Sequence, residues 1–170
     1  MPAPKLFVTG PPRSGKSTLA IEIAKETGFR FGGISTPEFK EGGERKGFMI
    51  KDLKTGRQGV LASKELRSPA NVGSYGVNLA DLDWIGSEAL ENACFDKDID
   101  LIVIDEIGKM ELFSKRFKEA VIACLQSNKR VLAVLHRDYV KDFKQYGEVF
   151  NLTPENRAEI KKRLLASLKQ

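Results

Sequence analysis

The chain has 170 residues, and its 28 lysines and arginines exceed its 23 aspartates and glutamates, so the net charge is +5. Hydrophobic residues make up 41% and charged residues 30% of the chain, a mixture that excludes a disordered polyelectrolyte and a low-complexity protein. The length fits a single domain over residues 1–170.

The sequence also argues against membrane insertion and secretion. No apolar run approaches the roughly 20 residues that span a bilayer, and the first residues lack the plan of a signal peptide. Cys94 and Cys124 lie far apart, each in a helix-like pattern, so we expect neither a disulfide framework nor a metal-binding cysteine pair. We therefore expect a cytoplasmic protein with no membrane partner, and we favour a monomer.

The chain opens with a predicted strand, loop and helix. Residues 5–9 form a short apolar run closed by Gly10, and apolar residues then recur at helical spacing over 19–24, with Gly28 placed to end the helix. From 32 to 78, glycines and short β-like pieces replace this periodicity, and 47–50 and 59–62 flank a turn, which predicts a β-hairpin. We interpret 32–78 as a β-rich insertion on the substrate side; a plain surface meander is the alternative.

The second half alternates helices and strands. The pattern predicts a helix over 82–93, a strand over 99–104, a helix capped by Ser114, a strand over 131–135, a short helix over 138–144, a strand over 149–152, and a last helix with Thr153 as N-cap and Pro154 at its first position. Apolar strands between amphipathic helices indicate an α/β fold with a mostly parallel sheet and helices on both faces.

The loop after the first strand carries the first chemical motif. Residues 10–17 fit G-x-x-x-x-G-K-[ST] between a predicted strand and helix, which is the context this phosphate-binding loop requires. Small residues let backbone amides point at a phosphate chain, Lys16 supplies a cation, and Ser17 offers a hydroxyl to Mg²⁺. The predicted nucleotide-binding residues here are Gly10, Pro11, Pro12, Arg13, Ser14, Gly15, Lys16, Ser17 and Thr18.

A second motif follows the apolar strand of the second half. It delivers Asp105 and Glu106 at the carboxyl end of a buried strand, where α/β sheets bind ligands. We expect Asp105 to hold Mg²⁺ through a water and Glu106 to orient or deprotonate an attacking water. The predicted nucleotide-binding residues of this segment are Leu101, Ile102, Val103, Ile104, Asp105, Glu106, Ile107 and Gly108.

Further cations could neutralise charge on a transferring phosphoryl group. Lys109, Arg45 and Arg137 are possible phosphate contacts in or near loops, and sequence does not choose among them. Each of them, taken alone, is more often a solvated surface residue.

These motifs together resemble the THEP1 family of small P-loop nucleoside-triphosphatases, described in animals as cancer-related NTPases. The resemblance covers almost the whole chain and rests most specifically on 104–111, with support from 10–17, 36–38, 45–48, 72–75 and 156–157. Lys40 stands where relatives often carry arginine, and Arg13 where glycine is common.

The resemblance implies a RecA-like P-loop core and Mg²⁺-dependent hydrolysis of NTPs to NDP and phosphate. It also implies broad tolerance of the base, so that ATP, GTP, CTP, UTP and TTP are all substrates. On the matching positions it makes Lys16, Ser17 and Asp105 the nucleotide and metal residues, with Glu106 as the base. Asn156 matches a family position near the nucleotide base.

Two other functions fit parts of the sequence. A nucleoside or nucleotide kinase would use the same loop and hold its acceptor in 32–78, although no compact arginine cluster for a lid is visible. A nucleic-acid-binding protein would need a basic stripe with stacking aromatics. Residues 156–170 hold five basic residues and one acid, so most of the net positive charge lies in the last helix, and nucleic acid is an unlikely partner.

Overall fold

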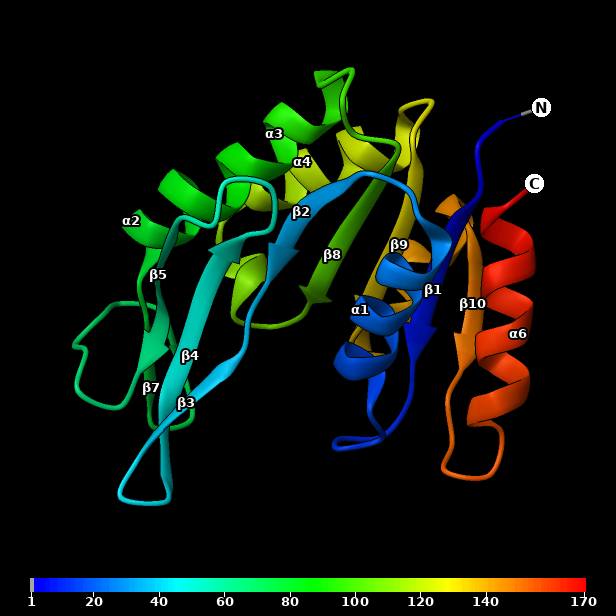
Figure 1. The fold of residues 1–170 in the computed structure, drawn as a ribbon. Helices are drawn as coiled ribbons and strands as arrows, with labels where there is room; N and C mark the ends of the chain where they lie inside the picture. Colours follow the sequence, from blue (N-terminus) through cyan, green and yellow to red (C-terminus); the bar gives the residue numbers. More distant parts are fainter. Residues whose placement is uncertain (1) are drawn as a thin grey trace.

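The computed structural model describes residues 2–170 and shows one continuous ten-stranded sheet between two layers of helices (Figure 1). One half of the sheet is parallel. It contains β1 (Lys5–Thr9), β2 (Phe31–Ser35), β8 (Leu101–Ile107), β9 (Arg130–Leu135) and β10 (Glu148–Asn151). These strands pair in the order β10-β1-β9-β8-β2. Helices cover both faces of this half, which explains why its strands read as apolar runs.

The other half of the sheet is antiparallel. It contains β3 (Glu38–Glu41), β4 (Glu44–Asp52), β5 (Gln58–Ser63), β6 (Asn71–Val72) and β7 (Tyr75–Val77). The order continues from β2 through β4, β5 and β7 to β6, and β3 pairs with β4 beside this path. The predicted hairpin at 47–62 is confirmed as β4 and β5.

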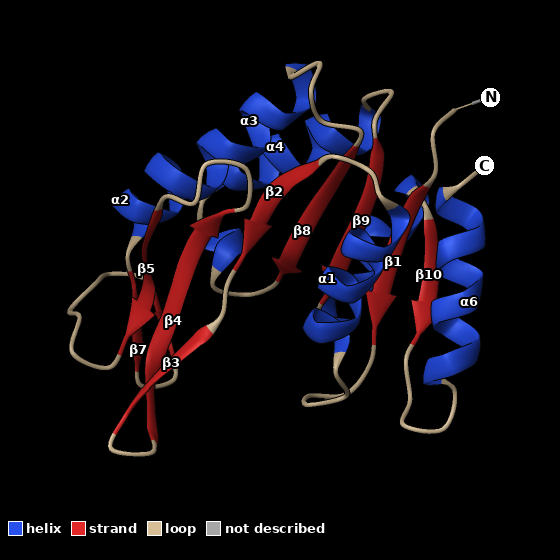
Figure 2. Cartoon of the chain, viewed as in Figure 1, coloured by secondary structure: helices blue, strands red, loops and turns tan. Residues whose placement is uncertain are grey.

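The sheet is therefore mixed, and the prediction of a mostly parallel sheet is wrong. A parallel neighbour needs a crossover of a dozen or more residues, whereas the short turns of the glycine-rich segment return the chain antiparallel. Residues 32–35 belong to β2 and pair in parallel with β8, so the antiparallel strands start only after Ser35. The α/β class and the helices on both faces are confirmed (Figure 2).

Two hydrophobic clusters bind the helices to the sheet. Helices α1 (Lys16–Thr27) and α6 (Arg157–Leu168) pack on one face. The other face is covered by α2 (Leu79–Asp81), a π-helical segment (Leu82–Ser87), α3 (Glu88–Phe95), α4 (Lys115–Gln126) and α5 (Val140–Phe143). Short 3-10 turns at Glu111–Phe113, Arg137–Tyr139 and Lys144–Tyr146 complete the elements. Within residues 2–170, no helix is long and apolar enough to cross a membrane.

One predicted helix cap is confirmed and another is corrected. The Ser114 hydroxyl accepts a hydrogen bond from the Phe117 amide at 3.0 Å, as predicted for the cap of α4. The prediction that Thr153 caps the last helix and that Pro154 is its first residue is wrong, because α6 starts at Arg157 with Asn156 as its N-cap and Pro154 lies in the turn before it. The Asn156 side chain accepts from the Thr153 amide and donates to the Asn151 carbonyl, both at 2.8 Å, and so closes the turn before the helix.

Replacing Asn156 with alanine removes both side-chain hydrogen bonds of this turn. We expect the free energy of unfolding to fall by about 1–2 kcal/mol, because two backbone groups lose their partners at a partly exposed site. Urea unfolding followed by circular dichroism measures the change. The exposed Asn92 on α3 is the matched control, and Asn92→Ala should shift stability by less than about 0.5 kcal/mol. Equal losses in the two variants would contradict the role of the turn.

Candidate functional site

The loop between β1 and α1 is sharply curled, and glycine makes this possible. At Gly10, φ is +153°, and a Cβ atom there would lie 2.5 Å from the carbonyl oxygen of Leu152. Gly15, the N-cap of α1, has a left-handed φ of 86°. Arg13 also has a positive φ, 61°, although it is not glycine. The loop thus passes against the segment after β10 and turns directly into the helix.

The start of α1 offers free backbone donors to an anion. No side chain among the described residues caps this helix, and its first turn contains no acid. The first amides of a helix have no intrahelical partner, so they point into the loop. The Lys16 ammonium arches back over the loop and donates to the carbonyls of Gly10 at 3.1 Å and Pro11 at 2.9 Å. The loop is therefore a positively charged concave backbone of the kind that binds phosphate.

The carboxyl end of β8 meets this loop. Asp105 is only 4% exposed, and its Oδ1 accepts a hydrogen bond from Ser17 Oγ at 2.8 Å. The Thr36 hydroxyl, just after β2, donates to the Asp105 carbonyl at 3.0 Å. Strand β9 lies between β1 and β8, so the two motifs approach each other across its end. The structure thus brings the loop and Asp105 together at one edge of the sheet, as the sequence predicted.

Burial controls the protonation of these acids. Burial, followed by the charge of Glu106, raises the pKa of Asp105 to about 6, although the Ser17 hydrogen bond and the charge of Lys16 oppose it. Burial also raises the pKa of Glu106, against the charge of Lys16. The pKa of Lys16 is lowered, chiefly by burial and also by the nearby charge of Arg137. These charged groups shift each other's pKa values because they lie in one poorly solvated site.

The oxygens at this site suit a hard divalent cation. The Ser17 hydroxyl and the Asp105 carboxylate are both oxygen donors, and they already lie in contact. Mg²⁺ binds through one or two such groups and keeps several waters. A cation would also offset the charge that burial makes costly on Asp105. The residues present therefore fit Mg²⁺.

A cavity of about 390 Å³ opens beside the loop, and one cation lines it. Arg137 follows the end of β9 and lines this cavity together with Gly10 and Pro11 of the loop. The buried Thr9 hydroxyl and the Ser14 hydroxyl have no hydrogen-bond partner among the described residues. The lining residues are Thr9, Gly10, Pro11, Arg137, Val140, Val149 and Asn151.

Sequence reasoning missed a third acid, Glu111. Its side chain is 2% exposed, and its Oε2 has no partner within the described residues. A Cβ atom built on Gly108 would lie 3.1 Å from Glu106 Oε1 and 3.2 Å from Glu111 Oε1, so both carboxyls face that glycine. Burial and the charge of Glu106 raise the pKa of Glu111 well above its usual range. The only sequence signal was its place at the end of the run 104–111.

Some residues that were predicted to bind the nucleotide are buried in the sheet and do not face the loop. The side chains of Leu101, Ile102, Val103, Ile104 and Ile107 are fully buried in the sheet. They position Asp105 and Glu106 and present no surface of their own. Gly108 faces the two glutamates, while Pro11, Pro12, Arg13, Ser17 and Thr18 lie exposed on the loop and the first turn of α1.

The remaining predicted contacts are dispersed. Arg45 lies on β4, where its Nε donates to the Tyr75 hydroxyl at 2.8 Å and its guanidinium stacks on the Phe48 ring at 5.1 Å. Lys109 is exposed just after β8. Asn156 uses its amide in the turn before α6. Of the three possible phosphate contacts, Arg137 is the one that lines the cavity at the loop.

The fold and this site define an α/β protein with an anion-binding loop and buried acids at the carboxyl edge of its parallel strands. A family model described as NTPase matches residues 5–165. The nucleoside-triphosphatase THEP1 of Methanocaldococcus jannaschii is 44% identical over 172 residues, which cover 97% of this chain and 99% of that protein. The THEP1 protein of Methanosarcina barkeri is 47% identical over 161 residues, 90% of each chain.

Two solved structures of proteins with similar names also match this chain. The crystal structure of THEP1 from Aquifex aeolicus matches with a TM-score of 0.83 and 35% identity, over 98% of this chain and 99% of that one. The solution structure of a human cancer-related nucleoside triphosphatase matches with a TM-score of 0.79 and 33% identity, over 98% of both. The chain belongs to this NTPase family, and the resemblance found in its motifs is confirmed.

Proposed function

We propose that this chain hydrolyses nucleoside triphosphates to nucleoside diphosphates and phosphate, with Mg²⁺, in a P-loop site on a RecA-like core. The 2.8 Å hydrogen bond from Ser17 to Asp105 carries the proposal, because it joins the phosphate loop to the acid-bearing strand. The position of β9 between the loop strand β1 and the acid strand β8 supports the RecA-like arrangement. Relatives of nearly full length that are named nucleoside-triphosphatases support the activity.

Each residue has a distinct part in this reaction. The loop amides and Lys16 bind the phosphate chain and fix its direction. Ser17 and Asp105 would hold Mg²⁺, which when bound neutralises charge on the phosphate oxygens. Glu106 orients a water toward the γ-phosphorus and accepts its proton; a P–O bond to water forms as the bond to the NDP oxygen breaks. Arg137 is placed to stabilise the charge on the transferring group.

We also propose that the site tolerates different bases. The side-chain amide of Asn156, the predicted base contact, is engaged with Thr153 and Asn151 on both of its polar ends. Binding then depends mainly on the phosphates, which all substrates share. We expect kcat/KM values for ATP, GTP, CTP, UTP and TTP to lie within about tenfold of each other, because the Asn156 amide is not free to select one base by a hydrogen bond. A preference of several orders of magnitude for one base would contradict this.

Phosphate release without an acceptor tests hydrolysis against the kinase alternative. With ATP and Mg²⁺ alone, we expect steady release of inorganic phosphate, and EDTA should lower the rate by at least roughly 10²-fold because charge neutralisation at the phosphates is lost. Adding back Mg²⁺ restores the rate and serves as the control. Release that begins only when a nucleoside or nucleotide acceptor is added would overturn the proposal.

A further inference from the structure

The two cysteines of the chain meet at the interface of two helices. Cys94 lies on α3 and Cys124 on α4, and their Sγ atoms are 3.0 Å apart. The two helices pack side by side over the same face of the sheet (Figure 1). Both cysteines are free thiols, as expected, but the fold brings them into contact although they lie far apart in the sequence. A disulfide has an S–S separation of about 2.05 Å, so the two sulfur atoms would have to approach by roughly 1 Å to form one.

The two thiols differ in access. Cys94 is partly exposed, whereas Cys124 is fully buried. The Cys124 Sγ also lies 3.5 Å from the Leu90 carbonyl, which is a second acceptor within reach of its single S–H. A reagent from solution can therefore reach Cys94 directly, and it reaches Cys124 only through Cys94.

Two lysines place positive charge beside the pair. The Lys5 ammonium donates to the Ser127 carbonyl at 2.7 Å and to the Cys124 carbonyl at 3.5 Å. The Lys129 ammonium donates to the Ile99 carbonyl at 2.6 Å and to the Asp96 carbonyl. These carbonyls lie at the ends of α3 and α4 and, for Ile99, in the loop between α3 and β8, so both cations are held at the end of the helix pair where the cysteines lie. A thiolate at Cys94 is stabilised by such charges.

The pKa shifts of the pair follow from these contacts. The hydrogen bond from Cys124 lowers the pKa of the Cys94 thiol, and the charges of Lys5 and Lys129 lower it further, against burial and the charge of Glu91. The same hydrogen bond and burial raise the pKa of Cys124. The exposure of Cys94 and the burial of Cys124, which these directions match, make Cys94 the attacking thiol of the pair.

We propose that Cys94 and Cys124 form a reversible oxidation site that takes a low-molecular-weight disulfide as its oxidant. The Cys94 thiolate attacks one sulfur of the disulfide, forming a mixed disulfide and releasing one thiolate. The Cys124 sulfur then attacks Cys94 Sγ; its proton goes to the leaving sulfur, and a second thiol is released. The two protein thiols together lose two electrons, and one disulfide is reduced to two thiols.

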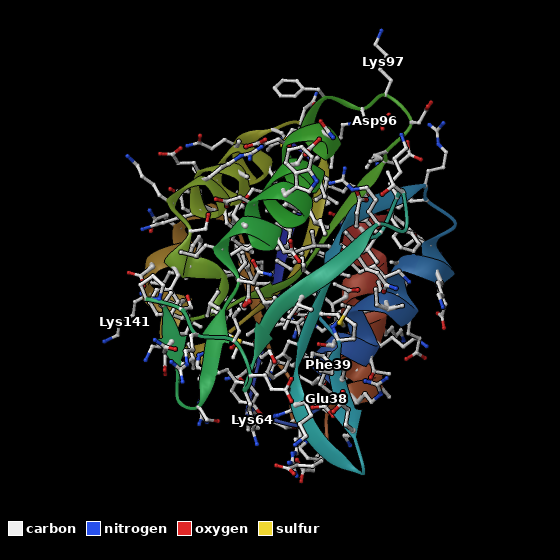
Figure 3. The ribbon with its side chains drawn as sticks, turned by 90° about the vertical axis from the view of Figure 1, so that its left-hand side faces the viewer. Glu38, Phe39, Lys64, Asp96, Lys97 and Lys141 are labelled. Atoms are coloured by element: carbon white, nitrogen blue, oxygen red, sulfur yellow. The ribbon has the colours of Figure 1, made fainter. Side chains whose placement is uncertain are left out.

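The site lies away from the nucleotide edge of the sheet. Cys94 and Cys124 sit near the carboxyl ends of their helices, before the starts of β8 and β9, whereas Asp105 lies at the end of β8. Asp96 and Lys97, just after α3, lie at the opposite end of the molecule from Glu38 and Lys64 (Figure 3). This inference is thus independent of the proposed hydrolysis, and phosphate release can report whether the cysteine variants are folded.

Titration of the full chain with 2,2′-dipyridyl disulfide tests the proposal. We expect two equivalents of pyridine-2-thione per protein and a mass lower by about 2 Da, with both thiols restored by dithiothreitol. Peptide mapping should join the peptides of Cys94 and Cys124. A final product that carries the pyridylthio group on Cys94, or one that keeps both thiols free, would overturn the proposal.

Two serine variants test the order of the steps. Cys124→Ser should release one equivalent and stop at a stable mixed disulfide on Cys94, because no resolving thiol is present. Cys94→Ser should react at least roughly tenfold more slowly than the native chain, since Cys124 is buried. Both variants should keep native phosphate release, which shows that they are folded. A Cys94→Ser variant that reacts at the native rate would contradict Cys94 as the point of entry.

Discussion

Replacing Glu106 with glutamine is expected to lower steady-state phosphate release by roughly 10²–10⁴-fold while NTP affinity stays within about threefold. Glutamine keeps the size of the side chain but cannot accept the proton of the attacking water. The poorly solvated position that raises the pKa of Glu106 makes it a stronger base when it is ionised. Binding should survive because, in the proposed mechanism, the phosphates are held by the free amides at the start of α1 and by Lys16, and not by Glu106.

The measurement pairs two assays on each variant. Phosphate release gives kcat, and the binding of a fluorescent non-hydrolysable NTP gives affinity. Glu159→Gln, which removes an exposed acid on α6, is the matched control and should change neither quantity. A Glu106→Gln variant that turns over at the native rate would remove Glu106 from the mechanism. A variant that loses binding and turnover together would assign it to substrate binding.

The site was largely predictable because its parts are local in sequence. The loop motif fixes the positions of Gly10, Lys16 and Ser17 between one strand and one helix, and a buried strand that carries Asp105 near its carboxyl end must bring that acid to the same edge. These two statements need only the strand-loop-helix pattern and the rule that parallel strands share their carboxyl edge. The 2.8 Å contact between Ser17 and Asp105 follows from them.

The antiparallel half of the sheet was only partly predictable. The turn between β4 and β5 gives a local sequence signal for their hairpin. The position of β2 in the sheet has no such signal, because β2 pairs with β8, which lies far away in the sequence. Glycine-rich segments carry little hydrophobic periodicity, so neither register nor neighbour could be assigned. The prediction of a mostly parallel sheet was based on the strands outside this segment, and those strands do pair in parallel.

Glu111 and the cysteine pair could not be found from the sequence for a different reason. Glu111 follows a short turn after β8 and looks like a solvated polar residue, yet the fold buries it beside Glu106. Cys94 and Cys124 are brought together only because α3 and α4 pack against the same face of the sheet. Both features arise from tertiary packing, on which local periodicity carries no information.

Of the candidate phosphate contacts, Arg137 is the one that lines the cavity beside the loop, and we expect its loss to be the second large effect. Arg137→Ala is expected to lower kcat by roughly 10²–10³-fold with a smaller change in KM, because charge develops on the phosphoryl group mainly in the transition state. The support is its place on the wall of the cavity beside Gly10 and Pro11, together with its effect on the pKa of Lys16. Arg137→Lys should recover only part of the rate, since lysine lacks the planar fork of donors.

Arg45→Ala provides the comparison, because the sequence ranks the two arginines equally. Arg45 is held by Tyr75 and Phe48 in the antiparallel half of the sheet, so its loss should leave kcat within about twofold and act on stability. Steady-state kinetics and thermal unfolding of both variants separate these effects. A large fall in kcat for Arg45→Ala with little change for Arg137→Ala would mean that the antiparallel strands close over the phosphates during turnover, and that the cavity cation is not the one used.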